Sequence, residues 1–282
     1  MRQRIAFLGV GRMGGRMARR LHDAGHDVTV YDPDPHATAA FEAAASPREA
    51  AAAADFILCS LPNPSIVREA VGEALESARP GAVIVDLSTG DPETARELAE
   101  HAARRDVGFL DAPVSRGVAG AEQGTLLIMV GGERATLERA RAVLEKLASD
   151  IVHVGPTGAG QAAKLCNQML TATIATALGE VLTAGVRAGV DLGTLIEVLK
   201  GGSAGNWVLS EHLPSTLLTD DRETSFSLAL MRKDVGLFAA ANDLPLSNLV
   251  KARFDEAHEQ GLDGADYTSV AELYENGVRL AC

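Results

Sequence analysis

The sequence lacks the clustered cysteines and histidines that build disulfide frameworks and metal sites. Its three cysteines, Cys59, Cys166 and Cys282, are odd in number and far apart, which favours a reducing compartment, so we expect a cytoplasmic protein. No CxxC or HExxH spacing appears among the residues. We therefore expect no bound metal and exclude the zinc-dependent alcohol dehydrogenases.

Long apolar runs and basic clusters are also missing. We find no stretch that approaches the roughly 18 apolar residues of a membrane helix, and the first apolar run is too short for a secretion signal. The formal net charge is −12, and no run of Lys and Arg reverses it locally. Because such an acidic chain repels phosphate backbones, we expect neither a membrane nor a nucleic acid as a partner.

Tyrosine is scarce as well. None of Tyr31, Tyr267 and Tyr274 has a lysine four positions later, and short-chain dehydrogenases require that pair, so this class is excluded. The chain does have 46% hydrophobic and 23% charged residues, which is typical of a folded protein with an apolar core. Its 282 residues suit two domains of ordinary size.

The first half of the chain repeats a short apolar run, a turn and a helix-like segment. The runs are continuous, as expected of parallel strands that helices cover on both faces; they occupy residues 5–8, 28–31, 56–61, 83–87, 109–110, 126–130 and 151–154. A capping box over residues 46–49 and the pair Asp91-Pro92 indicate helix starts between them. The pattern predicts an α/β Rossmann domain, doubly wound around a mainly parallel sheet.

The second half changes character. Residues 161–188 contain no proline and are enough for one helix of about 40 Å at ~1.5 Å per residue. Beyond them the chain offers only helix-like pieces, punctuated by glycine and proline, and no credible strand. We predict a Rossmann domain over residues 1–161 and an all-α domain over residues 162–282, with a long interdomain helix joining them.

A glycine-rich turn follows the first predicted strand. Its glycines allow a tight turn, close approach of a pyrophosphate and close helix–strand packing, and the helix N-terminus attracts the anion. The expected cofactor-binding residues here are Gly9, Val10, Gly11, Arg12, Met13 and Gly14. Asp32 ends the second strand, where a carboxylate receives ribose hydroxyls and repels a 2′-phosphate. We expect NAD, and NADP is disfavoured because no cation follows Asp32.

A glycine turn alone does not prove a dinucleotide site. Methyltransferases on this fold bind S-adenosylmethionine near a similar turn, with an acidic residue on the ribose. A non-catalytic dinucleotide-binding scaffold is a further alternative. The methyltransferase would form no reduced nicotinamide with any hydroxy acid, and the scaffold would bind NAD without turnover.

Four further segments, in order along most of the chain, resemble the motifs of the β-hydroxyacid dehydrogenase family. They are MGGRMA (13–18), DAPVSRG (111–117), GAGQAAKLCNQ (158–168) and FSLALMRKD (226–234). The family includes 3-hydroxyisobutyrate dehydrogenase and tartronate semialdehyde reductase and is related to 6-phosphogluconate dehydrogenase. The resemblance implies NAD-dependent oxidation of a small 3-hydroxy acid to its semialdehyde or oxo acid, or the reverse. It also implies a site in the cleft between the domains and a homodimer or homotetramer built through the helical domain.

Within this resemblance, Lys164 matches the family's catalytic lysine and is the expected general acid/base. To act near neutral pH its pKa must fall, which partial burial and the positive end of the long helix promote. Imine reductases share the fold and lack the lysine, so Lys164 favours alcohol chemistry.

The resemblance assigns further contacts to both halves of the chain. Ser115 and Gly117 match the loop that holds the substrate carboxylate, and Asn167 and Gln168 match a pair that positions the substrate. Lys233 matches a lysine near the nicotinamide and substrate, with Asp234 as its structural partner. Leu61, Pro62 and Thr89 match cofactor-contacting loops at the carboxyl ends of later strands.

Arg116 is the main departure from the family pattern, which has glycine at this position. An arginine there either points out of the loop or enters the pocket as a bidentate clamp for a carboxylate. We favour the clamp, which would select a diacid, a sulfonate or a phosphate-bearing substrate.

Overall fold

The computed structural model describes residues 2–219, 222–275 and 280. The chain divides into two compact units, Met1–Lys164 and Leu165–Cys282, and each is described by itself. The boundary expected from the sequence lay after residue 161, three residues before this division. Cys282 lies outside the described residues.

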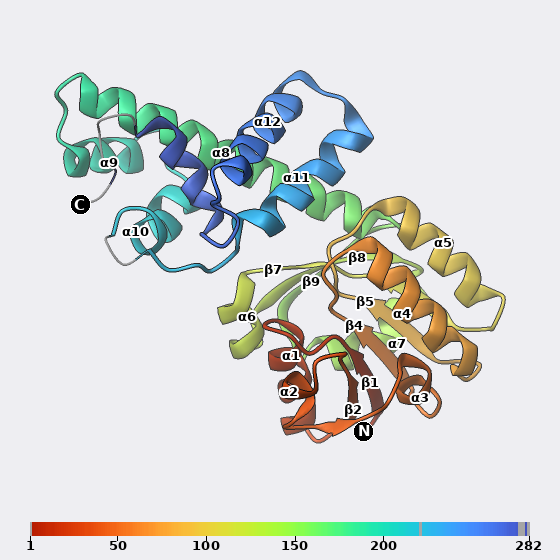
Figure 1. Ribbon diagram of the computed structural model, residues 1–282. Coiled ribbons are helices and arrows are strands. Elements are labelled where there is room, and N and C mark those ends of the chain that lie inside the picture. The colour runs from red at the N-terminus through yellow and green to blue at the C-terminus, as the bar shows by residue number, and fades with distance from the viewer. Residues whose placement is uncertain (1, 220–221, 276–279, 281–282) are drawn as a thin grey trace. The chain divides into compact units, whose positions relative to one another are not determined.

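The first unit is built on a single sheet, shown in Figure 1. The strands are β1 (Arg4–Leu8), β2 (Asp27–Tyr31), β3 (Glu42–Ala43), β4 (Phe56–Cys59), β5 (Val83–Asp86), β6 (Gly108–Asp111), β7 (Val114–Ser115), β8 (Leu126–Gly132) and β9 (Ala148–Gly155). Their order is β3-β2-β1-β4-β5-β6-β8-β7, with β9 on β8. The order reverses at β1, so the carboxyl ends of β1 and β4 form the switch point where such sheets bind ligands.

The expected strands are confirmed, and the sheet differs from the prediction in two details. The two-residue strands β3 and β7 were not predicted, because Glu42–Ala43 and Val114–Ser115 each contain a polar residue and form no apolar run. β8 runs antiparallel to both β6 and β7, although its apolar sequence is as continuous as those of the parallel strands. All other pairs are parallel.

The helices of the first unit are α1 (Gly14–Asp23), α2 (Pro35–Thr38), α3 (Pro47–Ala51), α4 (Pro64–Ser77), α5 (Pro92–Ala103), α6 (Gly117–Gln123) and α7 (Arg134–Leu144). Start signals were predicted for α1, α3 and α5. The Ser46 hydroxyl accepts from Glu49 N at 3.1 Å, and Asp91 caps α5 through Thr94 N at 2.8 Å. Both helix starts are therefore confirmed, although the Glu49 carboxylate accepts from Ala45 N at 2.7 Å, one residue before the position that a capping box uses.

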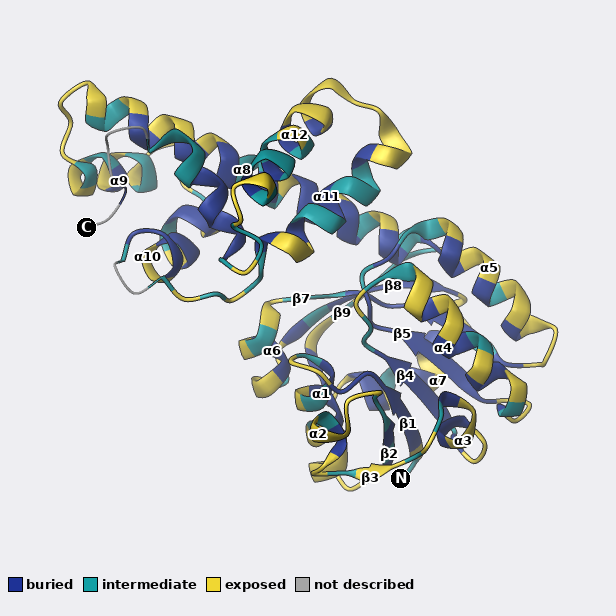
Figure 2. Cartoon of the chain, viewed as in Figure 1, coloured by how far each residue is buried: buried dark blue, intermediate teal, exposed yellow. Residues whose placement is uncertain are grey.

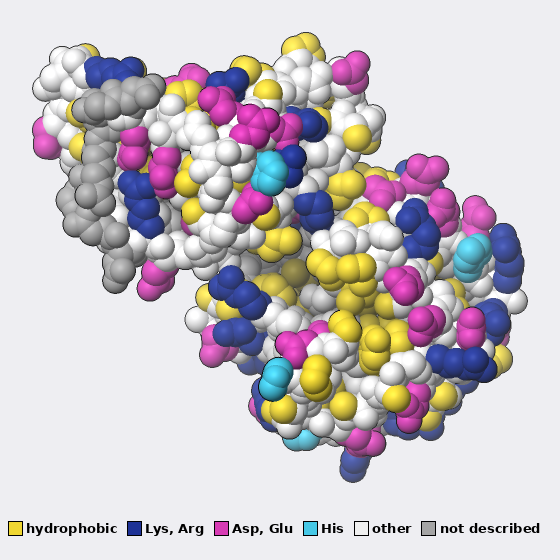
Figure 3. All heavy atoms as spheres, viewed as in Figure 1, with side chains coloured by type: hydrophobic (Ala, Val, Ile, Leu, Met, Phe, Trp, Pro, Cys, Tyr) yellow, Lys and Arg dark blue, Asp and Glu magenta, His cyan; other side chains and the backbone are white. Residues whose placement is uncertain are grey.

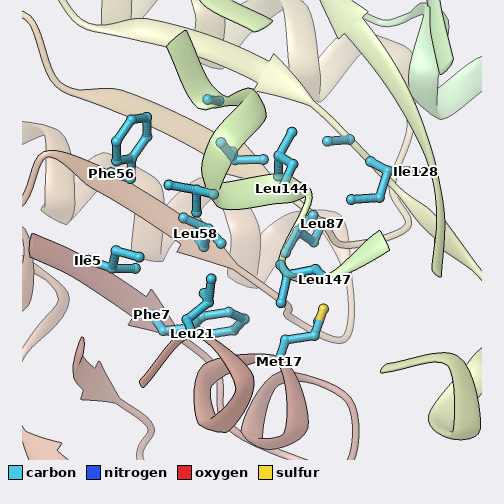
Figure 4. Packing of buried hydrophobic residues seen from close by; sticks show 14 of the residues in the cluster. Ile5, Phe7, Met17, Leu21, Phe56, Leu58, Leu87, Ile128, Leu144 and Leu147 are labelled. Carbon is cyan, nitrogen blue, oxygen red and sulfur yellow. The ribbon is translucent and has the colours of Figure 1, made fainter. Parts of the chain in front are cut away.

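Two apolar cores lie on opposite faces of the sheet because side chains alternate along each strand. Ile5 and Phe7 pack with Met17 and Leu21 of α1 and with α6 and α7, as Figure 4 shows in part. Ala6 and Leu8 face the other core, under α3, α4 and α5. This double burial is why the strands read as continuous apolar runs.

Helix α8 (Ala159–Arg187) begins in the first unit and runs through the second, as predicted. The second unit adds α9 (Leu192–Gly201), η1 (Val208–His212), α10 (Leu213–Thr216), α11 (Leu228–Asn242), α12 (Pro245–Glu259) and η2 (Tyr267–Tyr274). Within the described part of this unit the only strand-like pairing is an isolated bridge between Ser227 and Asp266. An all-α second unit is confirmed.

α8 provides the central element of both cores in the second unit. Met169 and Ala172 pack with α11 and α12, while Leu178 and Leu182 pack with α9 and η1. Figure 2 shows the resulting buried stripe along α8.

By length and composition α8 also passes as a membrane span, against the sequence-based expectation. An 18-residue window has a mean hydropathy of 1.5, and 44% of it is buried. Buried core helices of soluble proteins pass the same test, and α8 places several of its apolar residues, among them Met169 and Leu182, in the two cores of the second unit.

Candidate active site

The glycine turn after β1 has the geometry that dinucleotide binding needs. Gly9 has a φ of +84°, and a side chain there would lie 2.5 Å from Ser60 O. A Cβ on Gly14 would lie 1.9 Å from Gly9 O, so only glycine lets α1 approach the strand. A Cβ on Gly11 would meet nothing within 4 Å, which leaves backbone open at the N-terminus of α1, where phosphates bind. Val10 is buried, while Arg12 is exposed and Met13 half-buried.

Asp32 lies beside this turn, as expected. One of its carboxylate oxygens accepts from Val10 N at 2.8 Å and the other from Asp34 N at 3.0 Å. These bonds fix the carboxylate at the end of β2 and leave lone pairs for ribose hydroxyls. Between Asp32 and Arg48 the sequence has no Lys or Arg.

The loops after β4 and β5 are joined beside the glycine turn. Leu61 N donates to the Ser88 hydroxyl at 2.9 Å, and Leu61 Cδ2 would lie 2.7 Å from a Cβ on Gly9. Ser88 N donates in turn to the buried carboxylate of Asp86 at 2.9 Å. Thr89 and Pro62 lie in these loops, half-buried and exposed respectively. The first unit thus brings together the predicted cofactor-contacting segments around one sheet edge.

The first turn of α8 is held by a carboxylate with no exposed area. Asp111, at the end of β6, accepts from Gly158 N at 2.8 Å and from Gln161 N at 2.9 Å. Burial raises the pKa of Asp111, opposed by these backbone hydrogen bonds. Gly160 is needed here because a Cβ would lie 2.4 Å from Asp111 O. The helix start is therefore locked against the sheet.

Lys164 lies on α8 about one turn after the residues whose backbone N–H groups donate to Asp111. Its side chain is only 7% exposed, whereas a lysine on the solvent face of an amphipathic helix would be mostly exposed. Asn167 and Gln168 follow at three and four positions along the same helix. This spacing places all three on neighbouring positions of one helix face.

A buried carboxylate contacts two of the predicted substrate residues of the second unit. Asp234 on α11 is 1% exposed and lies 2.9 Å from Lys233 Nζ. It also accepts from Gln168 Nε2 at 2.8 Å, and Asn167 Nδ2 donates to Gln168 Oε1 at 3.3 Å. Asp234 therefore joins α11 to α8 through its hydrogen bond with Gln168.

Arg116 differs from the expected clamp. Its guanidinium donates to Asp150 Oδ2 at 2.7 Å, to Ser149 Oγ at 2.8 Å and to Thr125 O at 2.8 Å. The arginine is thus paired with a carboxylate of its own unit, and its charge is already neutralised. Its φ of +81° is a left-handed conformation, which explains why glycine is favoured at this position. Ser115 lies in β7, half-buried, and Gly117 begins α6 with a φ of +59°.

Sequence reasoning missed the roles of the residues that hold the site together. Asp111 and Gln161 lie inside the recognised motifs, but their partners are distant in sequence. Asp86 and Ser88 were likewise not singled out. The available signal was the position of both aspartates at the carboxyl end of a fully apolar strand, where an acidic residue is buried only if it has partners.

One face of the molecule shows mixed charge. On the face drawn in Figure 3, acidic and basic side chains are interspersed over each unit and no continuous basic stripe appears.

Comparison with known proteins identifies the family. Residues 4–155 match the model of the NAD binding domain of 6-phosphogluconate dehydrogenase, and residues 158–274 match that of the NAD-binding region of NADP-dependent 3-hydroxyisobutyrate dehydrogenase. The chain is 38% identical to the 3-hydroxyisobutyrate dehydrogenase of Pseudomonas aeruginosa, covering 96% of this chain and 98% of that protein. The chain belongs to the 3-hydroxyisobutyrate dehydrogenase family.

Other relatives agree. The NAD-dependent L-serine dehydrogenase of Pseudomonas aeruginosa is 35% identical, over 97% of this chain and 98% of its own length. A solved structure of the Mycobacterium tuberculosis 3-hydroxyisobutyrate dehydrogenase with L-serine is 35% identical, with a TM-score of 0.90, and covers 97% of this chain and 99% of that one.

This member of the 3-hydroxyisobutyrate dehydrogenase family is accordingly an NAD(P)-dependent oxidoreductase that acts on 3-hydroxyacids. The methyltransferase and scaffold alternatives are set aside. Relatives include users of both NAD and NADP, so the family alone does not choose between the two dinucleotides.

Proposed function

We propose that this enzyme oxidises a small 3-hydroxy acid to its semialdehyde with NAD, and that Lys164 is the general acid/base. The observation that carries the proposal is the burial of Lys164 one turn after a helix start that is locked to the dinucleotide-binding sheet. A lysine is rarely buried without a function or a partner, and the matched motif gives it the place of the family's lysine.

NAD is the cofactor we propose. The residues present fit it: the glycine turn opens at a helix N-terminus, and Asp32 is held for ribose hydroxyls by Val10 N and Asp34 N. A 2′-phosphate would bring negative charge to a segment with Asp32 and Asp34 and no cation before Arg48. Two unit charges about 4 Å apart repel by roughly 4 kcal/mol near a protein surface.

The proposed reaction separates the roles of cofactor and protein. When bound, the dinucleotide supplies the hydride acceptor. Lys164, in its neutral form, takes the hydroxyl proton as the carbonyl forms, and returns it in the reverse direction. Ser115 and the backbone at Gly117 hold the substrate carboxylate, while Asn167, Gln168 and Lys233 orient the rest of the substrate.

The proposed substrate class follows from the relatives and from the pairing of Arg116. Proteins 35–38% identical act on 3-hydroxyisobutyrate or L-serine, both with a primary hydroxyl two carbons from the carboxylate carbon. Because Arg116 is neutralised by Asp150, we infer a preference for a single carboxylate over a diacid.

We also propose that subunits associate through the helical unit. Of the large apolar side chains that are exposed in the described residues, only Ile66 and Val152 lie outside it; the others are Leu170, Val181, Val190, Val198, Trp207, Leu230, Leu244, Leu246 and Leu249. Leu244, Leu246 and Leu249 lie close together in the chain around the start of α12, and exposed apolar side chains that cluster mark association surfaces. Light scattering after size exclusion tests this, and a monomer at micromolar concentration contradicts it.

The test of the function is turnover by the variant Lys164→Ala. With 3-hydroxyisobutyrate and L-serine, we expect NADH formation to fall at least ~100-fold, because general base catalysis contributes about that much. Binding of NADH, followed by its fluorescence, should change little. Lys146→Ala, at an exposed lysine on the same unit, is the matched control and should be fully active. Intact turnover by Lys164→Ala would remove the assignment.

A further inference from the structure

One buried side chain connects the loop after β5 to the first turn of α8. Gln161 has no exposed area. Its Oε1 accepts from Gly90 N at 2.9 Å, and its Nε2 donates to Ser88 O at 2.9 Å. All of these groups lie in the first unit, so the connection does not depend on where the second unit sits.

The two bonds bracket a single residue. Ser88 O and Gly90 N flank Thr89. The Gln161 amide donates to the first and accepts from the second, as the backbone of a neighbouring strand would. A carbonyl acceptor and an amide donor are both required, and glutamine is a residue that supplies them with this reach. The backbone of Thr89 is thereby fixed at the carboxyl end of β5, where the loop is expected to contact the dinucleotide.

The backbone of the same residue fixes the helix. Gln161 N donates to Asp111 Oδ2 at 2.9 Å, beside the Gly158 N bond to the other oxygen at 2.8 Å. Lys164 follows three residues later, about 4.5 Å along the helix axis. A shift of the Gln161 side chain is therefore passed to Lys164 through less than one turn of helix.

We propose that Gln161 is a positioning residue of the dehydrogenase reaction. It holds the Thr89 loop and Lys164 in one rigid frame, so that the proton acceptor keeps a constant position relative to the bound nicotinamide. The inference rests on the proposed role of Lys164. Such a frame matters because a misplacement of about 1 Å can lower a rate about 100-fold.

The variant Gln161→Met tests the proposal, since it keeps length and volume and removes both amide bonds. Gln260→Met is the matched control, because Gln260 is exposed at the end of α12. For each variant we would measure the melting temperature, NADH affinity by fluorescence, and kcat and kcat/KM with 3-hydroxyisobutyrate and L-serine across pH. Gln161→Glu, which keeps the acceptor for Gly90 N, is the second variant if methionine prevents folding.

We expect Gln161→Met to lower kcat by about 10- to 100-fold, to weaken NADH binding, and to shift the acid limb of the pH profile of kcat/KM. Gln161→Glu, which loses the donor to Ser88 O and places a carboxylate there, should also lower kcat. In a Lys164→Ala background the Gln161 substitution should lower kcat no further, because the effects of substituting residues that act as a unit are not additive. A purely structural role would lower only the melting temperature.

Two results would overturn the inference: an unchanged kcat and pH profile in folded Gln161→Met, or full additivity with Lys164→Ala. These outcomes are distinct from failure of the proposed function. If Lys164→Ala is inactive and Gln161→Met behaves as wild type, only the positioning role is lost. If Lys164→Ala is itself active, the catalytic assignment falls first.

Discussion

Asp234 and Gln168 form a buried hydrogen bond of 2.8 Å that joins α11 to α8. The other oxygen of the same carboxylate lies 2.9 Å from Lys233 Nζ. The orientation of two proposed substrate-contacting residues thus depends on one acidic side chain that is 1% exposed. Its removal should affect substrate binding before it affects the dinucleotide.

Asp234→Asn keeps the shape of the side chain and removes its charge. We expect KM for the hydroxy acid to rise about 10-fold and stability to fall by about 1–3 kcal/mol, because a charge-assisted hydrogen bond and an ion pair are both weakened. NADH affinity should stay within about twofold. Asp255→Asn, at a more exposed ion pair with Arg232, is the control. Steady-state kinetics and urea unfolding measure both effects, and an unchanged KM would argue against the role of the cluster.

We predict that Asp32 controls the choice of dinucleotide. Replacement by Asn removes the charge that would repel a 2′-phosphate and keeps an acceptor for Val10 N. We expect kcat/KM with NAD to fall about 10-fold and the ratio of NAD to NADP efficiency to shrink by more than that. Parallel assays with the two dinucleotides give the ratio. If the wild-type enzyme already prefers NADP, the cofactor assignment is wrong.

Asp86 makes stability depend on pH. Burial raises its pKa to about 6, opposed by hydrogen bonds from Ser88. Between pH 4 and 6 the folded state therefore holds a proton that the unfolded chain has lost, so this group favours folding at low pH and the benefit disappears as pH rises through 6. The difference is worth about 3 kcal/mol.

The variant Asp86→Asn isolates this contribution. Relative to wild type, it should gain about 3 kcal/mol of stability as pH rises from 4 to 7. Urea unfolding of both proteins at several pH values measures the difference. A difference that is constant with pH would show that Asp86 titrates alike in both states.

Arg116 is expected to be dispensable for substrate selection. Its guanidinium is bound to Asp150, Ser149 and Thr125 O, and its left-handed backbone is one that glycine adopts without strain. Arg116→Gly should leave the relative rates on mono- and dicarboxylate substrates unchanged, with stability altered by no more than about 1 kcal/mol. A selective loss of diacid turnover would restore the clamp.

Much of this architecture could be predicted from the sequence because local patterns determine it. Continuous apolar runs gave the buried strands, the cap residues Ser46 and Asp91 gave helix starts, and the absence of proline over residues 161–188 gave α8. The reversed direction of β8 could not be predicted, since an antiparallel strand buried on both faces has the same apolar pattern as a parallel one.

The contacts that complete the site could not be predicted for a different reason. Gln161 meets Ser88 and Gly90 across 73 and 71 residues of chain, and Arg116 meets Asp150 across 34. No local pattern encodes such pairs. The motif around Lys164 indicated which residue to propose as the general acid/base, while the groups around its helix turn emerged only from the fold.

The most direct test of the central claim is chemical rescue of Lys164→Ala. If Lys164 transfers the proton, added small primary amines should restore NADH formation from 3-hydroxyisobutyrate in a manner that saturates with amine and varies with its basicity. Turnover of the variant at the wild-type rate without any amine would contradict the account.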